Sequence, residues 1–434
     1  MRSTAIASLT LIAAAAALAP ATTRAQEEPA TEEGPYGRTP DELRPFRGVG
    51  EPDRRFFVNA PAFRGPGRDE PAPEGLTSVA VGLLAPIHGP DAPAGRHMQN
   101  AARLALDEAN EAGGLDARHY GGRSLPFELF VRDESATWGA AGDAAVELVC
   151  DHEAWGLVGG YEDANSHVLT RVLVKLEVPN VNPAGVDTTI PEHNRPLLLR
   201  VRPSDRQTSY RLAAKVFTED ARERVVVLRA NSRYGRTGTR EFVDAARRLH
   251  KPILLEIRYD GGDYGAPSTG WAARMERIRA ARPDAVVVWG RPAETGAAVR
   301  ALRDAGIDCR VYGPDRLVSP ELLKAAGAAA EGLIFTYPMD PRPGREPWDA
   351  FRDRYRERFG VEPDATAAFT YDATRLLVDA IRAEGLNRAR ILDALFRLRR
   401  VDGVSGPILF DTTQNNVAPV ILGHVESGRF VFDG

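Results

Sequence analysis

Two matching units of apolar strand, glycine-bearing turn and amphipathic helix constrain most strongly what this chain can fold into. One unit begins with the apolar run 79–84 and the other with 224–228. Each is typical of the start of its own α/β lobe, in which helices cover both faces of a parallel sheet. We therefore expect two doubly wound parallel-sheet lobes with a ligand-binding cleft between them.

The alternation of strand and helix continues along the first half of the chain. Strand patterns at 126–131 and 156–160 alternate with helix patterns at 94–112, 140–150 and 166–177. Because the strands are separated by helices, the connections favour parallel strand pairing.

After an extended stretch at 197–202 the same alternation begins again. The expected elements are strands at 225–228, 253–259, 285–289, 309–312 and 332–336, with helices at 238–249, 271–281 and 294–305. Three helix patterns follow at 348–359, 366–384 and 388–398, and then two strand patterns at 406–410 and 417–424. The last strands are too few to build a third core, so we expect the chain to cross back and complete the earlier lobes.

The N-terminal residues 1–25 are typical of a secretory signal peptide. Arg2 precedes an apolar run at 5–19, and the Thr-Arg-Ala sequence at 23–25 resembles a cleavage site. The apolar run is too short for a membrane span, which needs about 20 apolar residues. We therefore expect a cleaved leader.

Residues 26–76 are rich in Pro, Gly, Glu and Arg, which predicts a linker. It is either a disordered spacer or an arm whose apolar residues 56–58 pack on the globular body. Neither of the two cysteines, Cys150 and Cys309, lies near the expected cleavage site, so the thiol that would carry a lipid anchor there is missing. We expect both to be buried free thiols.

Composition and motifs exclude several classes of function. The 56 basic and 60 acidic residues are mixed along the chain, so we expect no nucleic acid as partner. No nucleophile elbow, zinc-protease or phosphate-loop motif is present, and the eight histidines lack metal-ligand spacing. We therefore expect no catalytic residues, no metal site and no cofactor.

A series of short motifs carries a resemblance to a known family. They are residues 81–86 with Gly89-Pro90, 101–105 leading to 110–114, 158–160, 178–183, Tyr234-Gly235 and 313–315. In this order and spacing, the chain from residue 77 onward resembles a type I periplasmic solute-binding protein of the leucine/isoleucine/valine-binding kind. Such a protein is the extracytoplasmic component of an ABC importer.

The resemblance implies a domain organisation and a role. One lobe would comprise 77–199 plus 337–404 and the other 200–336 plus 405–434, joined by three crossing segments. The protein would act in the periplasm with an ABC permease of the inner membrane, and the cleft would close on a small polar amino-acid-like or amide-like solute. The alternative is a ligand-sensing subunit of the same fold that signals to a receptor or kinase.

The resemblance also places a ligand site at the start of the helix after the third strand. There, hydroxyls and backbone N–H groups receive a ligand carboxylate. In this chain that loop holds Tyr161, Asp163 and Asn165, and Asp163 falls on the family's hydroxyl position; the second hydroxyl position falls near Val186, close to Ala184. A carboxylate at Asp163 would compete with a ligand carboxylate, which disfavours an ordinary α-amino acid. Alternatively, Asp163 only caps the helix.

On the opposite lobe, Tyr234 matches the family's aromatic cleft residue, and Asp315 stands where a carboxylate receives the ligand's ammonium. Each could instead be an ordinary turn residue. Arg291 follows the strand at 285–289 and is expected either to be solvated or to pair with an anionic ligand or with Asp163. We expect a small solute with an amino or amide group to bind among these residues.

Overall fold

The computed structural model of the chain describes residues 38–44, 67–135, 139–192, 197–260 and 270–433, all of which belong to one compact unit. The expected signal peptide and most of the 26–76 segment lie outside the described residues. Within the described ranges, no helix combines the length and the apolar character that crossing a membrane requires.

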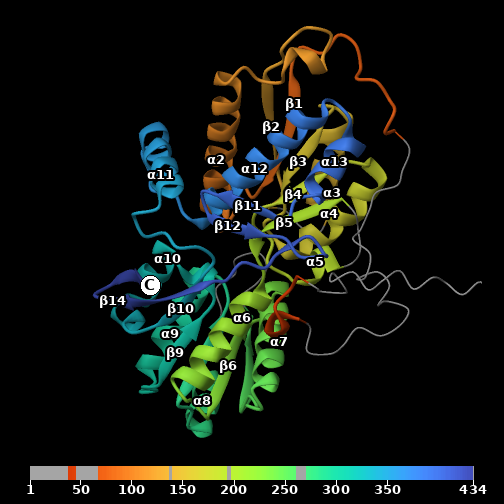
Figure 1. Cartoon of the computed structure of the whole chain (residues 1–434). Coiled ribbons are helices and arrows are strands. Elements are labelled where there is room, and N and C mark those ends of the chain that lie inside the picture. Colours follow the sequence, from red (N-terminus) through yellow and green to blue (C-terminus); the bar gives the residue numbers. More distant parts are fainter. Residues whose placement is uncertain (1–37, 45–66, 136–138, 193–196, 261–269, 434) are drawn as a thin grey trace, which may run out of the picture. The chain divides into compact units, whose positions relative to one another are not determined.

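The first sheet has six strands, all parallel, in the order β13-β5-β4-β3-β1-β2. The strands are β1 (Val79–Ala85), β2 (Phe127–Asp133), β3 (Gly156–Gly159), β4 (Asn180–Asn182), β5 (Leu198–Pro203) and β13 (Asn415–Asn416). Its helices include α2 (Ala92–Glu111), α3 (Ala140–Cys150), α4 (Asp163–Leu176), the short α5 (Thr189–Glu192), α11 (Glu346–Phe359), α12 (Ala365–Glu384) and α13 (Arg388–Phe396) (Figure 1).

The side chains of β1 show why this sheet carries helices on both faces. Val81 and Leu83 belong to the apolar cluster that contains Met98 of α2, whereas the next residue, Leu84, belongs to the cluster of Leu148 on α3. Successive strand residues point to opposite faces, so a continuous apolar run needs cover on both. The run 79–84 therefore predicted a strand buried on both sides, and all of β1 is buried.

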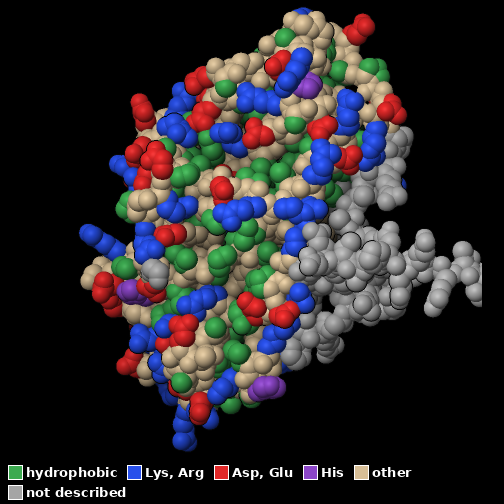
Figure 2. Space-filling view, viewed as in Figure 1, with side chains coloured by type: hydrophobic (Ala, Val, Ile, Leu, Met, Phe, Trp, Pro, Cys, Tyr) green, Lys and Arg blue, Asp and Glu red, His purple; other side chains and the backbone are tan. Residues whose placement is uncertain are grey.

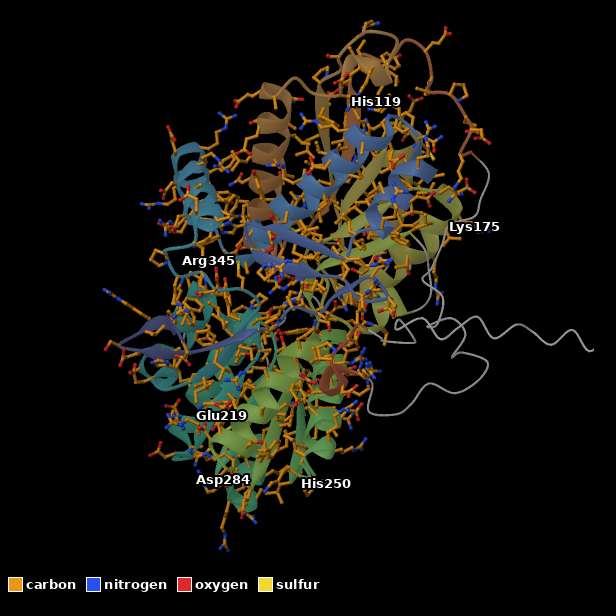
Figure 3. The ribbon with its side chains drawn as sticks, in the orientation of Figure 1. His119, Lys175, Glu219, His250, Asp284 and Arg345 are labelled. Atoms are coloured by element: carbon orange, nitrogen blue, oxygen red, sulfur yellow. The ribbon has the colours of Figure 1, made fainter. Side chains whose placement is uncertain are left out.

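The second sheet has seven strands in the order β15-β14-β10-β9-β8-β6-β7. They are β6 (Val225–Ala230), β7 (Leu255–Tyr259), β8 (Ala285–Trp289), β9 (Arg310–Gly313), β10 (Ile334–Tyr337), β14 (Ile421–Glu426) and β15 (Arg429–Phe432). The strands from β7 to β10 are parallel, and β14 and β15 add an antiparallel edge. Its helices include α6 (Asp205–Ala213), α7 (Arg233–Arg248), α8 (Trp271–Ala281), α9 (Pro292–Asp304) and α10 (Pro320–Ala326). Asp284, labelled in Figure 3, accepts the backbone N–H of Arg224 at 3.0 Å, just before β6 begins.

Three segments connect the sheets, between β5 and α6, between β10 and α11, and between β13 and β14 (Figure 1). The three predicted boundaries at 199/200, 336/337 and 404/405 differ from this sheet membership, since Tyr337 still pairs with Ile421 in the second sheet. β5 continues to Pro203, since Arg200 pairs with Asn415 of β13 and Pro203 pairs with Asn416. For the same reason residues 415–416 belong to the first sheet, whereas β14 belongs to the second.

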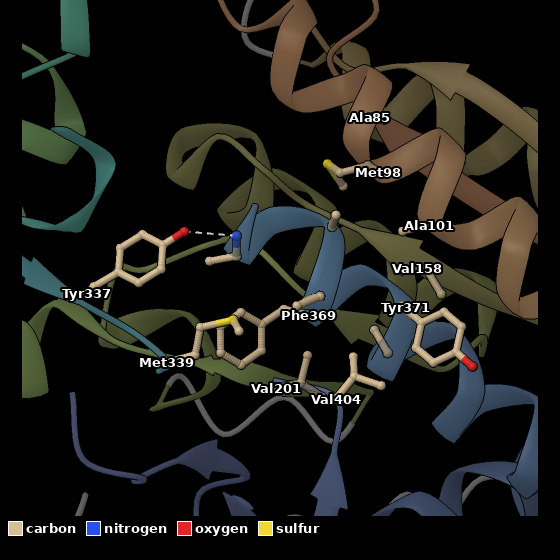
Figure 4. Packing of buried hydrophobic residues seen from close by; sticks show 14 of the residues in the cluster. Ala85, Met98, Ala101, Val158, Val201, Tyr337, Met339, Phe369, Tyr371 and Val404 are labelled. Carbon is tan, nitrogen blue, oxygen red and sulfur yellow. Dashed lines mark hydrogen bonds between the residues drawn. The ribbon is translucent and has the colours of Figure 1, made fainter. Parts of the chain in front are cut away.

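Apolar packing and hydrogen bonds hold in place the segment that leads from β10 of the second sheet to α12 beside the first sheet. The Tyr337 hydroxyl accepts the backbone N–H of Ala365 at 3.0 Å, and Met339 lies close to Phe369 of α12 (Figure 4). Arg345, labelled in Figure 3, donates to the carbonyl of Val404 at 3.2 Å. Val404 lies in the turn of a two-stranded antiparallel ribbon made by β11 (Arg400–Gly403) and β12 (Gly406–Leu409). The crossing is thus tied to the ribbon that follows α13.

Several local predictions need correction. Helix α6 was not predicted, although Ser204 and Gln207 form a capping box before it. Helix α7 begins at Arg233 rather than near 238, because Ser232 caps it and accepts the N–H of Gly235 at 3.1 Å. The prediction of two buried thiols is wrong for Cys150, which is exposed at the end of α3.

The surface carries both signs of charge. Figure 2 shows Lys and Arg side chains interspersed with Asp and Glu over the visible face. The mixture of charges on the surface follows from the mixture along the sequence. It leaves no large area of one sign of charge on the described part of this face.

Candidate functional site

The predicted site residues lie in loops at the carboxyl ends of strands from both sheets. Tyr161 and Asp163 follow β3, and Ala184 and Val186 follow β4. On the second sheet, Tyr234 is in the first turn of α7 after β6, Arg291 follows β8, and Asp315 follows β9 at the start of a short 3-10 helix, η4 (Asp315–Leu317). Carboxyl ends of parallel strands are where open α/β sheets place their ligands.

The turn before α4 depends on a glycine. Gly160 has a φ of +102°, and a Cβ at this position would lie 2.5 Å from Nδ2 of Asn182. Asn182 uses that amide to donate to the Gly160 carbonyl at 3.1 Å, and its Oδ1 accepts the N–H of Ala184 at 3.0 Å. The buried amide side chain of Asn182 therefore holds together the loop after β3 and the loop after β4.

Asp163 is the first residue of α4 and is completely buried. Its Oδ1 accepts the backbone N–H of Val186 at 2.8 Å and that of Asp187 at 3.1 Å. Its Oδ2 has no hydrogen-bond partner among the described residues. The structure thus brings Asp163 and Val186 together, but the N–H groups of Val186 and Asp187 already bind a carboxylate of the protein itself. Asp163 does not act as the N-cap of α4, which is Glu162.

Arg316 lies between the two predicted aromatic residues, and the sequence argument missed it. Its guanidinium carbon is 4.8 Å from the ring centroid of Tyr161 and 4.5 Å from that of Tyr234. One guanidinium nitrogen donates to the carbonyl of Tyr161 at 3.0 Å and to that of Ala184 at 3.4 Å. Burial opposes its charge, but the surrounding acidic groups, Asp163 among them, raise the pKa of Arg316 well above its ordinary value.

Two further carboxyl groups face this region. Asp315 pairs with Arg202 of β5, and its other oxygen, Oδ1, has no partner among the described residues. Asp205, the first residue of α6, is completely buried, and both of its carboxyl oxygens lack a partner in the described part of the chain. Burial, together with the charges of Asp163 and Asp315, raises the pKa of Asp205 well above its ordinary value. Asp205 therefore retains its proton at a pH where an exposed aspartate is ionised.

The hydroxyl of Tyr234 is also buried without a described hydrogen-bond partner. Burial and the nearby charges of Asp315 and Asp205 raise the pKa of Tyr234 well above its ordinary value, so it stays neutral. A neutral phenol can donate one hydrogen bond and accept others. It adds to the unsatisfied polar atoms at this point of the structure.

Arg291 closes the rim of the site. It contacts carboxylate oxygens of Asp91 and Glu162, each at 3.0 Å, so it is neither solvated nor paired with Asp163, two of the alternatives that the sequence left open. Glu162 also lies 3.9 Å from Arg316. Outside this rim is a groove lined from both sheets, with His88, Asp133 and Asn165 among its residues on one side and Arg233 and Arg236 on the other.

Asn165 has a supporting contact. Its amide donates to the backbone carbonyl of Glu134 at 2.6 Å, and the Glu134 carboxyl accepts the N–H of Tyr161 at 2.7 Å. Burial raises the pKa of Glu134 to about 8. Glu134, at the end of β2, thus positions Tyr161 from behind and was not predicted from the sequence.

The loop after β4 makes further contacts with α7. Arg233 donates to Asp187 at 2.8 Å, and Thr188 donates to Glu241 at 2.8 Å. Loops of both sheets therefore touch around the site. In the described residues no group of three or more His, Cys, Asp or Glu side chains has the arrangement that could hold a metal ion.

Comparisons with known proteins agree on one fold. The family model for periplasmic binding proteins matches residues 78–429. The Leu/Ile/Val-binding protein homolog 1 of Brucella abortus is 24% identical over 312 residues, which cover 71% of this chain and 79% of that protein. An amino acid binding protein of Pseudomonas aeruginosa is 24% identical over 318 residues, 72% of this chain and 80% of that protein.

Solved structures show the same architecture. A leucine binding protein from Thermotoga maritima superposes with a TM-score of 0.73 at 23% identity, covering 82% of this chain and 98% of that one. An R. palustris solute binding protein in complex with benzoate gives a TM-score of 0.71 at 18% identity, covering 82% and 96%. At these identities the superpositions establish the fold alone.

Proposed function

Since the chain belongs to the periplasmic binding protein family, we propose that it is the solute-binding component of an ABC importer and captures a small polar solute between its two sheets. Its relatives and structural neighbours are binding proteins rather than enzymes. We further propose that residues 1–25 direct export to the periplasm and that an inner-membrane permease receives the loaded protein.

The observation that carries this proposal is a set of buried polar atoms without partners where loops of the two sheets meet. Asp163 belongs to the first sheet, Asp205 follows the first crossing, and Tyr234 and Asp315 belong to the second sheet; all four are buried and leave at least one oxygen unsatisfied within the described residues. Buried polar groups are normally hydrogen-bonded, and leaving one unpaired costs about 1–3 kcal/mol. A bound solute with donor groups would supply the missing partners.

The chemistry of these atoms favours a solute with an amino or amide group. Carboxylate and phenol oxygens accept hydrogen bonds from N–H donors. A ligand carboxylate in the position used by amino-acid binders would meet Asp163, which already takes the N–H groups of Val186 and Asp187. Amino-acid binding by relatives therefore does not transfer directly to this chain.

Closure follows from the distribution of contacts over both sheets. A solute that binds Asp163 on one side and Tyr234 and Asp315 on the other binds best when the sides are together, so it shifts the population toward the closed state. The ion pairs that Arg291 makes with Asp91 and Glu162 act in the same direction. A permease can then distinguish loaded from empty protein by shape.

The test starts from the solute that the protein carries. Native protein purified from the periplasm is unfolded, and released small molecules are identified by mass spectrometry. Calorimetric titration of that solute should give at least tenfold weaker binding for Asp315→Asn, whereas Asp308→Asn, at a fully exposed side chain, should bind as wild type does. Small-angle scattering should show a smaller radius of gyration with solute. A protein that carries no solute, binds none from a broad metabolite library and keeps its dimensions would refute the proposal.

A further inference from the structure

Arg316 makes the contacts that a bound cation would make. It extends from the second sheet, yet its guanidinium donates to the backbone carbonyls of Tyr161 and Ala184, which end two loops of the first sheet. It also lies within 5 Å of the ring centroids of Tyr161 and Tyr234. Two carbonyl acceptors and two aromatic faces form a binding environment for a positive, N–H-rich group.

The place for a negative group is already taken. Oδ1 of Asp163 accepts the N–H groups of Val186 and Asp187, so these two backbone donors are not available to an incoming anion. An incoming carboxylate would have to approach Asp163 itself in a buried setting, where like charges repel strongly. Solutes with a carboxylate are therefore disfavoured at this end.

The remaining buried groups lack hydrogen-bond partners, which Arg316 does not provide. The free carboxyl oxygens of Asp163 and Asp315 can accept hydrogen bonds, whereas the protonated Asp205 carboxyl and the Tyr234 hydroxyl can each donate one and accept others. Oδ2 of Asp163, Oδ1 of Asp315, both carboxyl oxygens of Asp205 and the hydroxyl of Tyr234 are buried, and none has a partner in the described residues. These atoms come from four different segments of the chain and from both sheets. They are an independent sign that the site accepts an occupant with hydrogen-bonding groups other than the arginine.

We propose that Arg316 is an internal occupant of the cleft, and that the solute is an organic cation without a carboxylate, carrying a guanidinium, amidinium or ammonium group, which displaces the Arg316 side chain. This assignment rests on the proposed function and names the class of its solute. The exchange keeps the charge of the site constant, because one cation leaves as another enters. Arg316 regains its hydration while the solute takes over the carbonyls, the rings and the unpaired oxygens.

The solute class is tested on the wild-type protein, freed of any carried solute, by thermal shift and calorimetry. Benzamidine, n-butylguanidine and n-butylamine represent organic monocations, L-leucine represents zwitterions and benzoate represents anions. We expect binding of at least one cation and none of leucine or benzoate. Binding of leucine or benzoate without any cation overturns the assignment but leaves solute capture intact. Absence of binding by every cation also overturns it, and the identity of the carried solute then decides separately whether the protein captures solutes.

The role of Arg316 is tested by whether its replacement raises or lowers the affinity for the cation. Arg316→Ala removes the competing group, so the cation bound by wild type should bind at least tenfold more tightly. If the solute instead pairs with Arg316, the same variant loses affinity. Arg375→Ala is the matched control, because that guanidinium carbon also lies near a ring, 5.8 Å from the centroid of Tyr371, but outside the site. Its affinity should equal that of wild type. Should Arg316→Ala fail to fold, Arg316→Gln, which keeps hydrogen-bonding capacity but no charge, makes the same comparison.

Discussion

The buried carboxyl of Glu134 should make the stability of this protein fall as the pH rises through the neutral range. Burial raises the pKa of Glu134 from its ordinary 4.5 to about 8 in the folded protein. Between these values the unfolded chain has lost a proton that the folded chain keeps, so the free energy of unfolding decreases with pH. At ~1.4 kcal/mol per pKa unit, the whole effect amounts to about 5 kcal/mol, most of which falls between pH 5 and pH 8.

Glu134→Gln removes this titration while preserving the acceptor for the N–H of Tyr161. Urea unfolding followed by circular dichroism at pH 5, 6, 7 and 8 gives the free energy of unfolding of each variant. The difference between wild type and Glu134→Gln should grow with pH in favour of the variant, by about 3 kcal/mol over this range. Glu128→Gln, an exposed carboxylate on the same strand, should follow wild type. Parallel pH profiles for wild type and Glu134→Gln would show that the Glu134 carboxyl is not buried as described.

Three further expectations concern packing, exposure and closure. A Cβ at position 238 would lie 2.1 Å from the indole of Trp289, so Gly238→Ala should lower the free energy of unfolding by about 2 kcal/mol in urea titration; an unchanged value would contradict this packing. The exposed Cys150 should react with a thiol reagent in the native protein, whereas the buried Cys309 should react only after unfolding. Mass spectrometry of labelled peptides measures both reactions, and labelling of both cysteines in the native protein would contradict the burial of Cys309. Arg291→Ala should weaken binding of the carried solute roughly tenfold by calorimetry, because its two ion pairs link loops of both sheets, and unaltered affinity would exclude that role.

The sequence predicted helices and strands correctly where the spacing of apolar residues and the length of the segment both favoured the same kind of element. Helices α3 and α8 and strand β8 begin and end at the predicted residues, 140–150, 271–281 and 285–289. Helix α3 buries an apolar face, β8 is buried along its whole length, and α8 buries Met275 and Ile278 at helical spacing, so in each the sequence pattern matches the packing. Helix α6 was missed because its first turn is polar and its signal is the capping box that begins at Ser204 rather than an apolar period.

The missing helix also explains one missing site residue. Asp205 opens α6, so without that helix its carboxyl had no expected position near Asp163 or Asp315. The S-x-x-Q spacing from Ser204 to Gln207 was the available signal, since a capping box predicts a helix that begins at the next residue. Arg316 gave no comparable signal. It follows Asp315 directly, and which of two neighbouring side chains reaches across a cleft depends on tertiary packing.

Asp163 and Arg316 show why a sequence motif can predict the position of a binding site without predicting which group occupies it. The family resemblance predicted a hydroxyl where this chain has the carboxylate of Asp163, and that raised the question of how a buried negative charge is compensated. In the structure, a guanidinium from the other sheet lies beside the same two aromatic rings that the resemblance had assigned to a ligand. A charge introduced into one loop thus requires the opposite charge from another. A solute that displaces Arg316 must replace that second charge, which is why the proposed solute is a cation.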